Sequence, residues 1–162
     1  MEISYFEEYY AWADIRIIES LTKISDEELL IKKIEPDGRS IRDMVEHIAG
    51  SYEMIFNVPA SQEEFKGLFD KIKQYSWIEL IEYWKKWLNK YVKALRTDSF
   101  PMPSNSSVEI PSKNDYIFSY SDHSTYHRGQ LAFLINLTGN KAINTDYYTF
   151  LLEKQKQKQK TS

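Results

Sequence analysis

The chain has 162 residues, 42% hydrophobic and 28% charged, a balance typical of a folded globular protein. Its formal net charge is −3 and it has no cysteine, which argues against nucleic acid as a partner and excludes disulfides and thiolate metal ligands. The first residues resemble no signal peptide, and no window approaches about 18 uninterrupted apolar residues. We therefore expect a cytoplasmic protein that contacts neither nucleic acid nor a membrane.

Apolar residues recur at helical spacing near the start of the chain. Their stripe predicts a helix over about residues 4–22. Ser4 with Glu7 is a candidate capping box for this helix, because a serine and a glutamate three residues apart can bond to each other's backbone amide. Ser25 with Glu28 predicts the start of a short second helix in the same way.

Two further long helices are predicted in the middle of the chain. Ser40 with Asp43 opens the first of them, which should end near Asn57, before a proline. A smaller amphipathic piece at residues 65–72 follows. Ser76, with a glutamate three residues later, then caps the next long helix.

The last third of the chain begins with a loop and ends with a polar tail. Residues 97–113 hold three prolines and cannot continue a helix. A fourth long helix is predicted from Asn114, as its cap, to Gly139, where a left-handed residue would end it. A short last helix starts at Thr145, and the alternating lysines and glutamines after it predict a solvated tail.

These elements predict an all-α protein, a four-helix bundle with additional short helices. No internal repeat divides the chain. We expect one helical-bundle metal-binding domain over residues 1–153 and a flexible Lys/Gln-rich tail over residues 154–162.

The candidate site consists of the three histidines in the chain, His47, His123 and His127. His123 and His127 are four residues apart on a predicted helix, which places their imidazoles on one core-facing side about 5–6 Å apart. His47 lies beside the inward stripe of another long helix, so antiparallel packing would bring it to the pair. Three imidazoles would hold one divalent ion and leave a fourth position for water or substrate, as in catalytic zinc sites.

Other interpretations stay open at this level. Such histidines can satisfy their nitrogens by hydrogen bonds in the core, and pairs four residues apart also arise on solvated faces. The zinc-protease pattern H-E-x-x-H requires a glutamate directly after its first histidine, and Ser124 occupies that position here. Glu46 and Asp122 precede histidines and should point about 100° away from them, which suits surface or supporting roles.

Several segments of the chain resemble the DinB-like family of helical-bundle metalloproteins, also called DinB/YfiT-like. The resemblance runs almost end to end, and the His-Arg-Gly-Gln run at residues 127–130 is its most specific part. The segments that carry it are Tyr-Ala-Trp-Ala at 10–13 with Arg16, Ser-Ile-Arg-Asp at 40–43 before His47, His-Ser-Thr-Tyr-His-Arg-Gly-Gln at 123–130, and Asn-Thr-Asp-Tyr at 144–147.

This resemblance implies a four-helix bundle that often forms homodimers and a metal site made of His47, His123 and His127. Zinc and nickel both accept three imidazoles, so either ion fits. The better understood relatives are metal-dependent thiol transferases, thiol-dependent isomerases or hydrolases, which implies a small-molecule substrate such as a thiol.

Two functions remain in competition. The first is a metal-dependent enzyme of the thiol S-transferase or hydrolase type. The second is a non-enzymatic, metal-binding, stress-responsive homodimeric bundle, and the 15% aromatic content supports a dimer in either case. An open metal position beside a pocket would favour catalysis, and a fourth protein ligand would favour a structural ion.

The sequence also suggests residues around the site. Arg128 and Gln130 are expected to tie helices together, and Gly129 is expected to permit a close helix crossing. Candidates for side chains that ring a substrate pocket are Tyr9, Tyr10, Glu53, Tyr120 and Tyr126.

Overall fold

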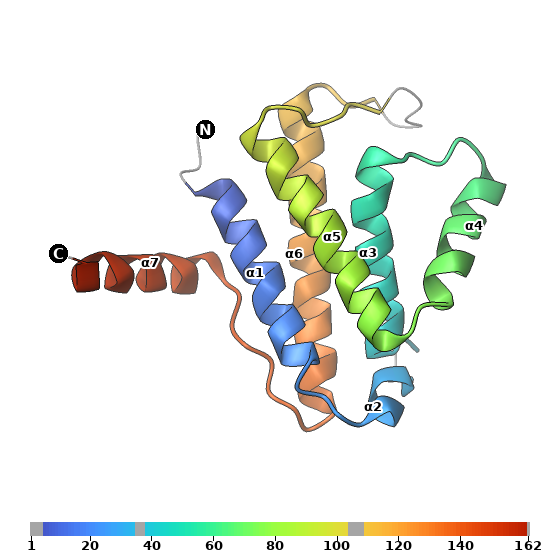
Figure 1. Ribbon diagram of the computed structural model, residues 1–162, viewed down its shortest axis with the longest axis horizontal. Helices are drawn as coiled ribbons and strands as arrows, with labels where there is room; N and C mark the ends of the chain where they lie inside the picture. The colour runs from blue at the N-terminus through green and yellow to red at the C-terminus, as the bar shows by residue number, and fades with distance from the viewer. Residues whose placement is uncertain (1–4, 35–37, 104–108, 162) are drawn as a thin grey trace.

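The computed structural model describes residues 5–34, 38–103 and 109–161, and this part of the chain is helical, with one isolated bridge between Ile34 and Arg39 as its only strand-like pairing (Figure 1). The expected all-α class is therefore confirmed. In chain order the helices are α1 (Phe6–Leu21), α2 (Glu27–Ile31), α3 (Ile41–Phe56), α4 (Gln62–Lys73), α5 (Trp77–Arg96), α6 (Lys113–Leu137) and α7 (Tyr147–Thr161).

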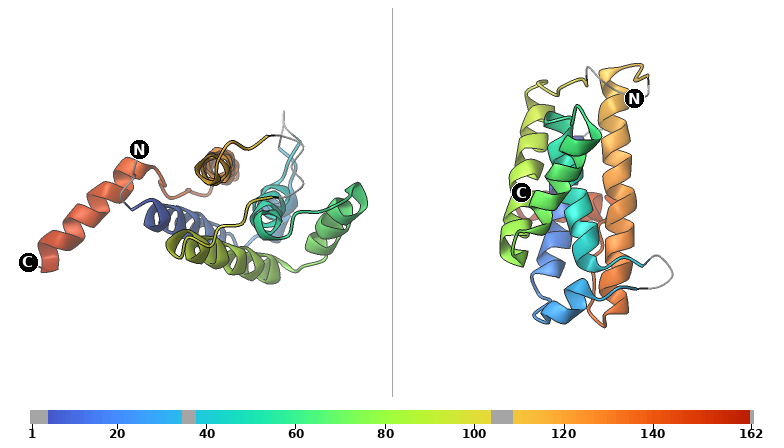
Figure 2. Two further views of the ribbon diagram at one scale, coloured as in Figure 1. Left: turned by 90° about the horizontal axis from the view of Figure 1, so that it is seen from above. Right: turned by 90° about the vertical axis from the view of Figure 1, so that its right-hand side faces the viewer.

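The four long helices α1, α3, α5 and α6 pack around one core. α5 and α6 each contact both α1 and α3 (Figures 1 and 2). In Figure 1, α1 and α6 run downwards and α3 and α5 run upwards, so α3 is antiparallel to α6. The parallel neighbours α3 and α5 are joined by α4, which returns the chain along the outside of α3. This is the topology of a bundle with a crossover connection.

Local capping explains where α3 and α5 begin. The side chain of Ser40 accepts a bond from the Asp43 amide, and Asp43 bonds back to the Ser40 amide. Ser76 and Glu79 make the same reciprocal pair at the start of α5. Both predicted capping boxes are confirmed, and α3 ends at Phe56 with Asn57 as its C-cap, close to the expected end.

Other helix starts differ from the prediction. α2 is capped by Asp26, whose carboxylate accepts from the Glu28 amide, and α6 is capped by Ser112 instead of Asn114. Each true cap lies one or two residues from the predicted one, because neighbouring Ser, Asp and Asn residues are nearly equivalent caps and only the tertiary structure selects among them. The predicted cap Ser4 lies outside the described residues. The end of α6 agrees with the prediction, since Gly139 has φ +82°.

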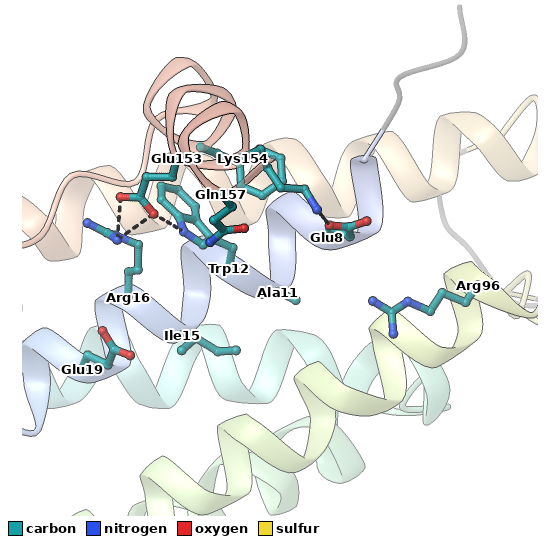
Figure 3. Close-up of a pocket in the computed structure, with 11 residues that line it drawn as sticks. Glu8, Ala11, Trp12, Ile15, Arg16, Glu19, Arg96, Glu153, Lys154 and Gln157 are labelled. Carbon is teal, nitrogen blue, oxygen red and sulfur yellow. Dashed lines mark hydrogen bonds and ion pairs between the residues drawn. The ribbon is translucent and has the colours of Figure 1, made fainter. Parts of the chain in front are cut away.

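The last helix, α7, leaves the bundle and crosses the outside of α1 (Figures 1 and 3). Trp12 and Arg16 of α1 both donate to the carboxylate of Glu153, at 3.1 and 3.0 Å, and Lys154 pairs with Glu8. In the segment expected to be a flexible tail, α7 continues to Thr161, and residues 155–160 are exposed to solvent, as expected for a solvated tail. Lys and Gln are good helix formers, so a helix nucleated at its docked first turns can continue through them.

None of the described helices is both long and apolar enough to cross a membrane.

Candidate metal centre

The three histidines converge between α3 and α6. The Nε2 atoms of His47 and His127 are 3.0 Å apart, and one ring nitrogen from each of His47, His123 and His127 lies within 4.8 Å of the other two. Two nitrogens that ligate a tetrahedral ion at about 2.0–2.1 Å would lie about 3.3 Å apart. The antiparallel packing of α3 on α6 thus brings His47 to the pair on α6, and the group could hold a metal ion.

A hydrogen bond fixes the proton of His127. Its Nδ1 lies 2.6 Å from Oε1 of Gln130, and a carbonyl oxygen can only accept, so Nδ1 carries the hydrogen. In the neutral form of this ring, the lone pair is then on Nε2, which lies 3.0 Å from Nε2 of His47. The amide of Gln130 is held in turn, because its Nε2 donates to the hydroxyl of Tyr126 at 3.1 Å. Gln130 orients a histidine of its own helix and does not tie two helices together.

The site keeps two of its three imidazoles, those of His47 and His123, neutral. Burial, followed by the neighbouring His127 and His123, lowers the pKa of His47 to about 4. Burial and His127 also lower the pKa of His123. A cation is unfavourable in a partly dry site beside other imidazoles, so these two rings stay unprotonated at neutral pH. Neutral imidazole is the form that binds a metal.

A cavity of about 380 Å³ opens beside the histidines and reaches the inner side of α4. It is lined by His47 and His123 together with Ser51, Met54, Phe65, Phe69, Ser119 and Tyr120. Among the described residues, the ligand group contains no carboxylate and no fourth histidine. Three nitrogens beside a cavity are what an ion with an exchangeable position requires.

The other pocket candidates are placed elsewhere, and only Tyr120 lines this cavity. Tyr9 and Tyr10 are buried in the core. Glu53 accepts from the Tyr83 hydroxyl and lines a separate cavity. Tyr126 is 62% exposed and contacts the outer side of His127.

Sequence reasoning missed a buried polar network next to the histidines. Asp14 on α1 is fully buried and forms an ion pair with Arg128 of α6 at 2.7 Å. The same carboxylate accepts from Tyr52 of α3 at 2.8 Å and from Trp84 of α5 at 3.2 Å. Ser124, the residue after His123, is within reach of both Tyr52 and Arg128. All four bundle helices thus meet at one carboxylate.

This network sets the register of the helices that carry the histidines. The Asp14 carboxylate receives its bonds from Tyr52, Trp84 and Arg128 only when α1, α3, α5 and α6 keep one arrangement, although the buried Nε of Arg128 has no hydrogen-bond partner among the described residues. Arg128 therefore ties helices together, as predicted, and Ser124 belongs to the network. A charged residue at position 14, between apolar Ala13 and Ile17, was the sequence signal for it. Gly129 faces open space, so the predicted close crossing there is wrong.

A second cavity, of about 440 Å³, lies between α1, α5 and α7, away from the histidines (Figure 3). Two ion pairs, Arg16 with Glu153 and Lys154 with Glu8, span it from α1 to α7. It contains no histidine, and its charged groups hold α7 in place. The cavity beside the histidines is therefore the candidate site.

Fold and site together define a class of protein: helical bundles that gather neutral histidines from two antiparallel helices into a group fit for a metal ion. The DinB family model matches residues 4–159, nearly the whole chain, and the chain belongs to the DinB family. Comparison with curated proteins and with solved structures gives no match.

Proposed function

We propose that the protein binds one divalent ion through His47, His123 and His127 and is a metal-dependent enzyme of the thiol S-transferase or hydrolase type. The observation that carries this proposal is the convergence of three ring nitrogens within 4.8 Å at the wall of a cavity. An accessible cavity favours a catalytic ion, because a structural ion is normally closed off by four protein ligands. The substrate is a small molecule.

An ion held by three neutral imidazoles keeps its full double charge and lowers the pKa of a water or thiol bound to it. The chain supplies the neutral rings and, through Gln130, the orientation of His127. Three carboxylates near the histidines are unsuited to take the proton. Asp122 precedes His123 and is exposed at the surface. Glu46 is paired with Arg42, and Asp14 is held in the buried network. A thiol that the ion itself deprotonates therefore suits this site better than peptide hydrolysis.

Elemental analysis of protein purified without a histidine tag tests the proposal. We expect one zinc or nickel ion per chain, lost in the His127→Ala variant, because two imidazoles hold an ion much less tightly than three. The matched control is Asp122→Asn, a change at an exposed residue next to His123 that should retain the ion. Full occupancy in the His47→Ala, His123→Ala and His127→Ala variants alike would refute the ligand set.

The homodimer that belongs to the alternative function is supported by the outer face of α6. Four large side chains are exposed there and lie within about 100° of one another around the helix axis. They are Phe118, Tyr126, Phe133 and Leu137, between 52% and 64% exposed. An apolar stripe of this kind marks an interaction surface. We propose that it pairs two copies of the chain, which is compatible with an enzyme as well.

A further inference from the structure

The cavity beside the histidines has one polar end and one apolar wall. His47 and His123 form the polar end. Phe65 and Phe69 of α4, with ring centroids 5.0 Å apart, and Met54 of α3 form the apolar wall. The Phe65 side chain is 41% exposed, so this wall has apolar surface that no other part of the described chain covers fully.

The position of α4 depends on a glycine in α3. A Cβ atom at Gly50 would lie 2.8 Å from the ring of Phe69 and 3.1 Å from the side chain of Ile72, both on α4. Because glycine leaves this space free, α4 approaches α3 closely, and Ile72 is completely buried. The apolar wall is thus a packed part of the fold.

The described residues that line the cavity carry no formal charge. Apart from the two histidines, which stay neutral, they are apolar, hydroxyl or phenol side chains. Burial raises the pKa of the Tyr120 hydroxyl, so that group is neutral as well. The thiolate head of a ligand would neutralise part of the ion's charge, and no arginine or lysine is present in this lining to pair with a second, anionic group on the ligand's body. A charge placed against the apolar wall would therefore lose its hydration with little compensation.

We infer that the cavity selects substrates with a metal-binding head, such as a thiolate, and an uncharged apolar body of about the size of a phenyl group, which packs against Phe65, Phe69 and Met54. This inference rests on the proposed function, since the head needs the ion. A volume of about 380 Å³ is at the small end of the range typical of small-molecule pockets, about 300–1,000 Å³.

The experiment uses the full-length protein loaded with cobalt and three thiols. These are 2-phenylethanethiol, with an apolar body, 2-mercaptoethanol, with a small polar one, and 2-mercaptoethanesulfonate, with an anionic one. Each is titrated while the sulfur-to-cobalt charge-transfer band is recorded. We expect 2-phenylethanethiol to bind at least about tenfold more tightly than the other two, because several buried carbon atoms add affinity.

Two variants then test which side chains cause the preference for the phenyl thiol. Phe69→Ala, or Phe65→Ala if the first change disturbs α4, should remove most of the preference for the phenyl thiol and leave the affinity for 2-mercaptoethanol unchanged. The matched control is Tyr148→Ala, which removes an aromatic ring that is 71% exposed on α7. It should bind all three thiols like the unaltered protein.

The outcomes separate the two proposals. Charge-transfer bands of equal affinity with all three thiols would overturn the apolar selection and leave the thiol-binding metal site standing. If the histidines bind cobalt but no charge-transfer band appears at any thiol concentration, both the proposal that thiols bind the ion and this inference would be wrong. A preference for the sulfonate would overturn the inference by showing a cationic subsite.

Discussion

At the scale of single residues, burial in the bundle lowers the pKa of His47 and His123, two of the three candidate ligands. His47 lies beside two other imidazoles in a partly buried site, and its pKa is lowered to about 4. The unfolded chain has no such constraint, so there the pKa of this side chain is near 6.5. The difference means that protonation opposes folding in the metal-free protein.

The sign of the resulting pH dependence follows directly. Above pH 6.5 His47 is neutral in both states and has no effect. As the pH falls from about 6.5 to 4, the unfolded chain takes up a proton that the folded chain does not, so the free energy of unfolding decreases. We expect urea unfolding with a chelator present to show this decrease, and His47→Gln to show a shallower one. Identical pH profiles for the two proteins would contradict the lowered pKa.

At the scale of the elements, local information predicts well where capping is strong. The Ser40–Asp43 and Ser76–Glu79 boxes mark α3 and α5 because both partners are three residues apart. The spacing of His123 and His127 likewise places both rings on one side of α6. The ion pair between Asp14 and Arg128 could not be predicted in this way, because its partners are 114 residues apart and meet only through tertiary packing.

The place of α4 against α3 is also a tertiary property, and Gly50 allows a test of it. Gly50→Ala adds a methyl group 2.8 Å from the Phe69 ring, so the Phe69 ring, the Ile72 side chain or α4 itself must shift. We expect a loss of about 1–3 kcal/mol in the free energy of unfolding, the usual cost of overpacking. The matched control is Gly67→Ala within α4, where nothing lies within 4 Å. That change should stabilise by about 0.5–1 kcal/mol through helix propensity.

Chemical denaturation of the two alanine variants measures the difference. A Gly50→Ala protein that is stabilised as much as Gly67→Ala would show that α4 does not pack closely on α3. The apolar wall of the cavity would then lose its structural basis, because Phe69 reaches the cavity from this helix.

At the scale of the whole molecule, the two sides of α6 carry different groups: candidate metal ligands on one side and exposed apolar side chains on the other. Its inner face carries His123 and His127 toward α3, and its outer face exposes Phe118, Tyr126 and Phe133. Sequence periodicity does not separate these faces, because aromatic residues lie on both. The structure assigns them, and it leaves more than half of the surface of each of these three side chains exposed. A dimer that forms along α6 would therefore cover the outer stripe and would not involve the α4 residues that line the cavity.

The dimer gives the last prediction. Light scattering on the full-length protein at micromolar concentration should report twice the chain mass of 19.3 kDa. Phe133→Glu places a charge in the middle of the stripe and should yield a monomer, because a carboxylate buried without a partner at an interface is strongly unfavourable. Ile78→Glu is the matched control, since Ile78 is 76% exposed on α5, outside the stripe. It should remain dimeric.

Metal content and helical circular dichroism should be unchanged in both variants, because neither residue lines the cavity. This control separates a lost interface from a lost fold. A monomer of 19.3 kDa for the unaltered protein would remove the dimer, and a Phe133→Glu protein that stays dimeric would move the interface away from α6. Either result would leave the proposed metal site untouched, because its three candidate ligands all come from one chain.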